Sequence, residues 1–467
     1  MKLMQPLAIP AFRNMFAAQA LSLIGSGLAT VALGLLAYDL AGENAGIVLG
    51  IAMAIKMVSY VFISPLAAAL ASNISRRRFM VGLDLARAGL VLFFPFVDQI
   101  WQVYLLIFLL FSLTAGFTPV FQATIPDVVK DEDTYVDALT LSRVSFNIEA
   151  IASPILAGIF MKVMAFNWLF VFTSLGFLAS AYLVWKISFL TASVVKNPAP
   201  FLKRVTTGLV IFRKTPRLRG LMSLNVVVSL MAANVYINSI ILAHETLAGT
   251  DQTYLNLLLF FGAGSIVAAL ALRPLIRLLT VRGLCLGAAF LASLGPGLLW
   301  ISQTETMLFS VWTIIGLSTS LITTSSGILL RSSAMEQDRP SVFAAQFSLS
   351  HACWLVAYLL VAWMGREIGP VATVWLTGGV ALVFAVIAVP VWVRVGNRPL
   401  KHTHINHQHE HMHVHDEHHQ HEHIGDEGPE PHQHPHRHKK LIHSHEFIID
   451  DHHPNWPNMR KTYRDIG

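Results

Sequence analysis

The sequence is poor in charged residues and in cysteine. Only 13% of its 467 residues are Asp, Glu, Lys or Arg, whereas 54% are hydrophobic and the mean hydropathy is +0.57. This composition is typical of an integral membrane protein. The two cysteines, Cys285 and Cys353, lie in apolar stretches, which excludes a disulfide framework and a Cys-x-x-Cys metal site. The sequence also lacks a nucleotide-binding loop and a nucleophile arrangement, so we expect a protein that is not an enzyme and that uses an ion gradient.

Basic residues are scarce in every second connection between apolar segments. Twelve such segments, each long enough to span a bilayer as a helix, lie at about 12–38, 45–71, 79–97, 101–123, 138–163, 167–189, 219–243, 253–279, 283–301, 306–330, 341–364 and 371–394. The N-terminus and alternate loops carry 22 Lys and Arg residues, and the intervening loops carry only Lys162 and Arg366. The positive-inside rule therefore places both termini in the cytoplasm. The basicity reflects this topology, so we expect a lipid bilayer, and no nucleic acid, as a partner.

The connection at 190–217 divides the apolar segments six and six. Pro10 and Arg13 open the first segment as Pro216 and Arg219 open the seventh, at an offset of 206 residues. Such repeats are typical of transporters whose substrate site lies at the midplane between halves. We predict an all-α integral membrane protein with twelve transmembrane helices and four parts. These are a six-helix half at 1–189, a cytoplasmic linker at 190–217, a second six-helix half at 218–394 and a tail at 395–467.

Histidine is concentrated in the tail. Of the 21 histidines, 19 lie between positions 402 and 453, most of them two residues apart with acidic residues between them. Neutral imidazoles at this spacing can bind nickel, copper, zinc or cobalt. The tail has few apolar residues and several Gly and Pro residues, so we expect disorder without metal. The candidate metal ligands are His402, His404, His407, His409, His411, His413, His415, His418, His419, His421, His423, His432, His434, His436, His438, His443 and His445.

Charged side chains inside the apolar segments are few. A charge at the bilayer centre costs about 2.5–3.5 kcal/mol on insertion scales, so each one is a candidate for function. Glu149 is the strongest candidate for a proton carrier, because a carboxylate in a low-dielectric cavity can hold a proton that an arriving metal ion displaces. A structural ion pair with Lys56 or Arg143 is the alternative. The candidates for proton coupling or gating are Glu149, Asp84, Arg87, Lys56 and Arg143.

Uncharged polar residues in the segments are candidates for the transport path. His351 lies in the eleventh segment, where a neutral imidazole could bind the transported ion or could simply pack. Asn147 is four residues from Arg143 and shares its helix face. Asn234 and Asn238 are also four residues apart, and they either line the cavity or tie helices together.

Two short motifs resemble the major facilitator superfamily, and the resemblance covers about residues 10–394. Residues 72–80 (SNISRRRFM), followed by LDLARA at 83–88, are similar to its signature loop, with Asn73 in place of the usual acid and with Arg77 and Arg78 kept. Residues 153–158 (SPILAG) are similar to the antiporter motif of its fifth helix. The resemblance implies two six-helix halves and export. The missing acid moves the expected gating role to Asp84.

Residues 124–158, together with the histidine-rich tail, look like the nickel-resistance exporters of this superfamily. That resemblance implies efflux of nickel, with cobalt or zinc as further divalent cargo, across a bacterial inner membrane by proton antiport. It also implies that no cofactor is required beyond the transported or bound metal. We expect the protein to function as a monomer.

Three hypotheses follow. The first is a divalent-metal exporter, and the second is an exporter of a drug, siderophore or metal chelate whose tail buffers or senses metal. The third, a metal-storage or regulatory membrane protein, is disfavoured because Lys56, Asp84 and Glu149 are embedded at a cost in several helices. A cavity with one imidazole and one carboxylate would favour a small ion, and a large aromatic-lined cavity would favour organic cargo. Because a flexible tail raises only the local metal concentration, we expect deletion of 402–467 to weaken resistance without abolishing it.

Overall fold

The computed structural model describes two units of the chain separately. The membrane unit is Met1–Val393 and the tail unit is Arg394–Gly467. The described residues are 2–41, 45–71, 74–187, 201–249 and 251–392 in the membrane unit, and 400–404, 408–413, 432–437, 441–445 and 456 in the tail unit.

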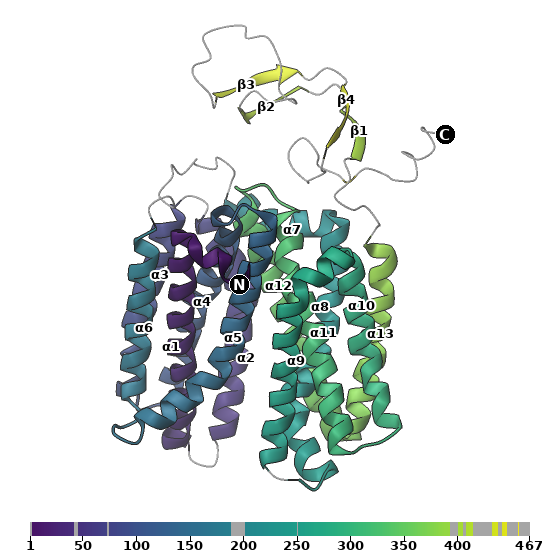
Figure 1. The fold of residues 1–467 in the computed structure, drawn as a ribbon. Helices are drawn as coiled ribbons and strands as arrows, with labels where there is room; N and C mark the ends of the chain where they lie inside the picture. Colours follow the sequence, from purple (N-terminus) through teal and green to yellow (C-terminus); the bar gives the residue numbers. More distant parts are fainter. Residues whose placement is uncertain are drawn as a thin grey trace. The chain divides into compact units, whose positions relative to one another are not determined.

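The membrane unit is a bundle of long helices that run side by side (Figure 1). The helices are α1 (Pro10–Ala41), α2 (Ala45–Ala71), α3 (Arg76–Val91), α4 (Ile100–Val128), α5 (Glu132–Phe160), α6 (Trp168–Trp185), α7 (Phe201–Lys214), α8 (Pro216–Ile241), α9 (Asp251–Leu278), α10 (Val281–Leu294), α11 (Glu305–Arg331), α12 (Arg339–Ile368) and α13 (Pro370–Val391). Short 3-10 helices precede α1 and follow α3 and α10, at Lys2–Ala8, Phe94–Phe96 and Gly295–Trp300. A π-helical turn, Leu242–Thr246, follows α8.

Eleven of the helices in the described residues are long and apolar enough to cross a membrane. The remaining long helix, α5, has 29 residues and carries five charged side chains, which lowers its hydropathy. It packs against α1 and α9 within the bundle. The predicted all-α membrane fold is therefore confirmed, with α5 as the twelfth long helix.

The start of α5 differs from the hydropathy prediction because a polar residue caps the helix. α5 begins at Glu132 rather than at 138, since the Asp131 carboxylate accepts hydrogen bonds from the Thr134 hydroxyl and from its backbone N–H (2.8 Å). These hydrogen bonds lower the pKa of the Asp131 carboxyl. Glu132 and Asp133 in the first turn add a favourable interaction with the helix dipole. Hydropathy detects only the apolar part of such a helix.

The connection between the sixth and seventh long helices contains a helix that the sequence analysis did not predict. α7 (FLKRVTTGLVIFRK) packs against α2 and α12. At Gly208 the backbones come so close that a Cβ atom would lie 1.9 Å from the Ser341 carbonyl oxygen. Glycine is therefore required at this contact. Arg213 and Lys214 lie in the last turn of α7, where cations interact favourably with the helix dipole.

The long helices pack mainly within two groups, α1 to α6 and α8 to α13. Between the groups, α2 and α4 contact α12, and α5 contacts α9. Two hydroxyl groups donate across the α2–α12 contact, from Ser64 to the Ala344 carbonyl (3.3 Å) and from Ser348 to the Val61 carbonyl. We call the end of the bundle where α1 begins and α13 ends the terminal face. α5 begins at this face and α9 ends there (Figure 1).

The described part of the tail unit contains four short strands. They are β1 (Leu400–His404), β2 (Gln408–His413), β3 (His432–Arg437) and β4 (Leu441–His445). β1 pairs with β4 and β2 pairs with β3, both in the antiparallel sense. Most other tail residues lie outside the described residues, so the disorder expected for them stays a prediction.

Candidate transport site

A cavity of about 560 Å³ lies between the two groups of helices. Its lining comes from α1, α2, α3, α4, α5 and α6 on one side and from α8, α11 and α12 on the other. Much of the lining is aromatic, and these residues are Tyr60, Phe111, Phe117, Phe121, Phe146, Phe177, Phe343, Phe347 and Trp354. Ser, Thr, Asn and Gln side chains also line the cavity and outnumber the aromatic ones. A concave surface that combines aromatic side chains with polar groups can bind a small organic molecule.

Lys56 brings a positive charge into this cavity. Its ammonium lies 4.8 Å from the Phe111 ring centroid and 5.7 Å from that of Tyr60, which are cation–π distances. Among the described residues it forms no ion pair. Lys56 therefore offers its charge to whatever enters the cavity.

His351 lies at the contact between α12 and α2. Its ring packs edge-on against Tyr60 of α2, at 4.7 Å between centroids, and against Phe347, at 4.2 Å. The ring Nδ1 lies 2.7 Å from the Phe347 carbonyl oxygen, which can only accept, so Nδ1 donates its hydrogen. A neutral ring then carries its lone pair on Nε2. Tyr60 therefore contacts both His351 and Lys56.

Arg143 and Glu149 reach the same cavity from α5. Arg143 makes no ion pair among the described residues, and its Nε is buried without a hydrogen-bond partner. The cavity therefore contains Lys56 and Arg143 as cations against Glu149 as the one carboxylate in its lining, because the third cation, Arg87, is paired with Asp84.

Gly27 of α1 leaves space that the side chains of Glu149 and Ser153 occupy. A Cβ atom at Gly27 would lie 2.5 Å from Glu149 Oε1 and 2.0 Å from the Ser153 hydroxyl oxygen. Both distances are too short for non-bonded carbon and oxygen atoms, so a side chain at position 27 would force Glu149 and Ser153 to move. The signal of Gly27 in the sequence is only a glycine within an apolar segment.

Gly27→Ala is expected to destabilise the protein by about 1–3 kcal/mol, as overpacking does in a filled core. Thermal unfolding of the purified protein measures the loss, and Ser153→Gly in the same chain should restore part of it. The matched control is Gly82→Ala on α3, where a Cβ would meet nothing within 4 Å. An equal effect of both alanine substitutions would contradict this role for Gly27.

The two predicted asparagines of α8 lie away from the cavity, whereas a third asparagine of the same helix lines it. Asn234 and Asn238 are buried outside the cavity lining. Asn234 donates to Thr377 of α13 (2.9 Å), and Asn238 donates to Asn234 (2.8 Å), so the pair ties α8 to α13. Asn225 precedes Asn234 on α8 and lines the cavity. Its side-chain amide exchanges two hydrogen bonds of 3.1 Å with the side-chain amide of Gln346. For Asn147 only the helical backbone belongs to the described residues.

Asp84 and Arg87 form a buried ion pair within α3. The Ser180 hydroxyl donates to Asp84 (2.8 Å), and the Arg87 guanidinium lies between the rings of Phe117 and Phe177, 4.3 and 4.5 Å from their centroids. All of these partners belong to α3, α4 and α6. The structure therefore places Asp84 inside the first helix group rather than at the contact between the groups.

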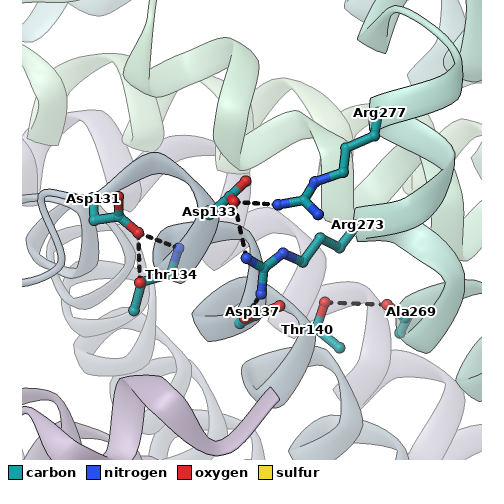
Figure 2. Close-up of polar contacts among 8 residues, drawn as sticks. All are labelled: Asp131, Asp133, Thr134, Asp137, Thr140, Ala269, Arg273 and Arg277. Atoms are coloured by element: carbon teal, nitrogen blue, oxygen red, sulfur yellow. Dashed lines mark hydrogen bonds and ion pairs between the residues drawn. The ribbon is translucent and has the colours of Figure 1, made fainter. Parts of the chain in front are cut away.

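An ion cluster joins the groups at the terminal face, and we call it the α5–α9 cluster. Figure 2 shows Arg273 of α9 between Asp133 and Asp137 of α5, with Arg277 also on Asp133. Arg273 Nη2 lies 2.9 Å from Asp133 Oδ2, and one turn further into the bundle the Thr140 hydroxyl donates to the Ala269 carbonyl (3.1 Å). The hydrogen bond from Arg273 lowers the pKa of the Asp133 carboxyl. The acids at the start of α5 and the arginines at the end of α9 are each placed where the helix dipole favours them.

A second ion cluster at the terminal face is centred on Asp127 at the end of α4. Its carboxylate is paired with Arg76 of α3 and with Arg339 of α12. Arg76 also donates to the Glu336 carbonyl (3.0 Å). Of the signature-loop residues predicted from sequence, Arg77 donates to the Trp185 carbonyl (3.3 Å) and Arg78 is exposed, whereas Asn73 lies outside the described residues.

The residues of these two clusters do not stand out in the sequence. Their signal is weak, because acids and arginines in loops are normally attributed to topology. The pairing becomes visible only when α5 meets α9 and α4 meets α12. Within the described residues, no group of three or more His, Cys, Asp or Glu side chains is arranged to hold a metal ion.

A cavity between two groups of six long membrane helices that ion pairs join at one end is the arrangement of a membrane transporter of the major facilitator type. Residues 2–335 match the model of the transmembrane secretion effector family, and the chain belongs to that family. No curated protein matches the chain.

Solved structures share the fold at low sequence identity. The human organic anion transporter MFSD10 (TETRAN) has a TM-score of 0.67 and 14% identity, over 81% of this chain and 99% of that one. A bacterial homologue of the iron transporter ferroportin, in an outward-facing state, has a TM-score of 0.64 and 11% identity, over 82% and 98%. The same homologue soaked with iron has a TM-score of 0.63.

Proposed function

We propose that the protein exports a divalent metal as a complex with a small anionic organic ligand, with nickel as the leading candidate for the metal. The observation that carries this proposal is the charge of an aromatic-lined cavity. Lys56 and Arg143 face a single carboxylate there, Glu149, and the remaining lining combines nine aromatic side chains with hydroxyl, amide and aliphatic ones. An anion gains from both cations, and its organic part gains from burial against the rings.

The same charges oppose a bare divalent cation. Two unit charges interact by about 2 kcal/mol at 8 Å with an effective dielectric of 20, so each cation in the cavity weakens the binding of a metal ion appreciably. The histidine-rich tail supports metal as part of the cargo, because its imidazoles suit late first-row divalent ions. One similar structure is named as an organic anion transporter, which agrees with an anionic ligand as cargo. Another is named as a homologue of an iron transporter, which agrees with a metal as cargo.

The second candidate function is export of the free metal ion, nickel or cobalt, by proton antiport. The presence of Glu149 and His351 in one cavity favours it, because a metal ion bound there would displace the proton of the carboxyl group. One imidazole and one carboxylate are two ligands, fewer than the four that first-row ions usually take.

The orientation follows from the distribution of basic residues in the loops. We propose that the terminal face is cytoplasmic, in a bacterial inner membrane, with the tail on the same side. The two ion clusters then close the cytoplasmic end of the transport path. The tail raises the local concentration of metal at that end when the clusters open.

The charge selectivity of the cavity is tested by thermal unfolding of the purified full-length protein with a panel of ligands. We expect small carboxylates such as citrate to raise the melting temperature, because a ligand that binds the folded state stabilises it. Lys56→Gln should weaken this binding about 10- to 100-fold, the value of hydrogen bonds to charged groups.

The control for this experiment is Lys162→Gln, which removes an exposed lysine in a loop. Citrate contains no metal, so the histidines of the tail do not contribute to the measured shift. Equal stabilisation of the wild type by organic cations, or an unchanged citrate response in Lys56→Gln, would contradict an anion site.

A further inference from the structure

One side of α7 is buried against the membrane unit. Gly208, Ile211 and Phe212 form this side, and all three are buried. The close contact of Gly208 with Ser341, near the start of α12, places α7 at the terminal face, where it also packs against α2 (Figure 1). α7 therefore lies beside helices of both groups with a fixed orientation about its own axis.

The opposite side of α7 combines exposed apolar and cationic side chains. Leu202 is 73% exposed and Val210 is 44% exposed, and Lys203 and Arg213 are exposed as well. Steps of three or four residues keep to one face of a helix, so Leu202, Thr206, Val210 and Arg213 form a row along α7. Lys203 adjoins the start of this row. We call these five residues the outer face of α7.

The charges of α7 are all positive. Its sequence contains four basic residues and no acidic residue. The hydroxyl of Thr206, in the middle of the outer face, donates to the carbonyl oxygens of Leu202 (3.0 Å) and Lys203 (3.1 Å). Because this hydroxyl is satisfied within the helix, the row between the two cations can enter an apolar environment without losing a hydrogen bond to water. The outer face thus suits a partner that is negatively charged and apolar at once.

The surface of α2 that faces lipid ends at the level of α7. Phe62, Leu66 and Leu70 are spaced four residues apart on α2, are exposed and lie outside the cavity lining. Such an apolar row on the outside of a membrane-spanning helix faces hydrocarbon. α2 ends at Ala71, at the terminal face where α7 packs against it. α7 therefore lies where hydrocarbon gives way to lipid headgroups.

We propose that α7 lies in the membrane–water interface and that its outer face binds the headgroups of anionic phospholipids. Leu202 and Val210 enter the boundary of the acyl chains, and Lys203 and Arg213 extend their charged ends to the phosphates. Basic residues at this depth attract an anionic leaflet, which a zwitterionic leaflet does not match. The interaction does not depend on the cargo of the cavity.

A fluorescent label on Val210→Cys reports on the outer face in the full-length protein, in a chain with Cys285→Ala and Cys353→Ala. The labelled protein, in mild detergent, is titrated with phosphatidylglycerol or with phosphatidylcholine. We expect phosphatidylglycerol to shift the emission of an environment-sensitive dye to shorter wavelength at a lower mole fraction than phosphatidylcholine does. Added salt should weaken the response to phosphatidylglycerol, because it screens exposed charges.

Lys203→Gln combined with Arg213→Gln should weaken the apparent affinity for phosphatidylglycerol about 25-fold, since each cation near an anionic surface contributes about fivefold. The matched control is Arg78→Gln combined with Lys130→Gln, which removes two exposed cations elsewhere on the terminal face. This control should keep the affinity of the parent chain. All four side chains are exposed, so an unchanged melting temperature in both variants confirms the fold.

Three results would overturn the proposal. The first is an equal response to phosphatidylglycerol and phosphatidylcholine, and the second is an unchanged affinity in the α7 variant. The third is an equal loss in the control variant, which would indicate general attraction to a basic surface. A response that grows with protein concentration at constant lipid would also contradict it, because the outer face would then bind a second copy of the chain.

Discussion

Arg273→Ala is expected to open the terminal face of the membrane unit. Asp137, whose side chain is only 4% exposed, would lose its partner, and Asp133 would keep only Arg277. Leaving a buried charged acceptor unpaired costs about 2–3 kcal/mol, which changes the ratio of closed to open molecules by about a hundredfold. That is enough to convert a closed population into a largely open one.

The opening is measured as a distance between spin labels at the start of α5 and the end of α9. Suitable positions are Glu132→Cys and Leu278→Cys, both exposed, in a chain with Cys285→Ala and Cys353→Ala. A longer distance in Arg273→Ala is the expected result, and the exchange of Arg273→Asp with Asp137→Arg should restore the short one.

The matched control for Arg273 is Arg366→Ala. Arg366 is 87% exposed and lies 3.9 Å from an exposed partner, Glu367, so its loss should cost well under about 1 kcal/mol. The account of the α5–α9 cluster would be wrong if Arg273→Ala left the distance distribution as it is in the wild type.

Glu149→Gln is expected to strengthen the binding of an anionic complex and to uncouple it from protons. Removing the one carboxylate that opposes Lys56 and Arg143 removes a repulsion of about 2 kcal/mol for a negative charge 8 Å away, or more than tenfold in affinity. In the wild type, an arriving anion favours protonation of Glu149, so binding should take up protons from solution. The variant should bind the anion more tightly and should take up no protons.

Calorimetric titration with citrate in buffers of different ionisation enthalpy measures the affinity and the number of protons taken up on binding. The second candidate function makes the opposite prediction for Glu149→Gln, because a free metal ion loses a ligand and its proton exchange. Weaker citrate binding, together with loss of gradient-driven nickel transport, would favour free metal ions as cargo. Ser142, which lines the cavity without a charge, provides a neutral control as Ser142→Ala.

The Asp133 carboxyl of the α5–α9 cluster is not expected to respond to the proton gradient. The carboxyl of Asp133 has a lowered pKa, so its contribution to closure is present above the ordinary pKa of an aspartate and is lost only when the pH falls through the lowered value. Near neutral pH this carboxylate stays ionised in either conformation. Glu149 is thus a better candidate for proton coupling than Asp133.

The fold could be predicted well from the sequence because hydropathy and loop charge are properties of single segments. Twelve apolar segments give twelve long helices, and the segment with the most charge, α5, still packs as one of them. The helix α7 could not be predicted in the same way, since its position depends on the close contact of Gly208 with Ser341. Capping by Asp131 likewise moved the start of α5 beyond its apolar part.

The candidate site was predictable only in part. Lys56, Arg143, Glu149 and His351 stand out as polar residues in apolar segments, and all four line one cavity. Asn234 and Asn238 stand out equally but bind each other and α13, because sequence spacing does not tell which face of a helix meets the cavity. Contacts between distant segments, such as Asp137 with Arg273, have no local signal at all.

The most direct test of the central claim is uptake of radioactive nickel into energised inverted membrane vesicles. Nickel is presented either as the free ion or as its anionic citrate complex, to the intact chain, a chain lacking 402–467 and Lys56→Gln. Such vesicles are positive inside, which drives an anion inward. The account predicts accumulation of the complex by the first two chains, little by Lys56→Gln, and none of the free ion. Accumulation of free nickel without the complex, or of neither, would contradict it.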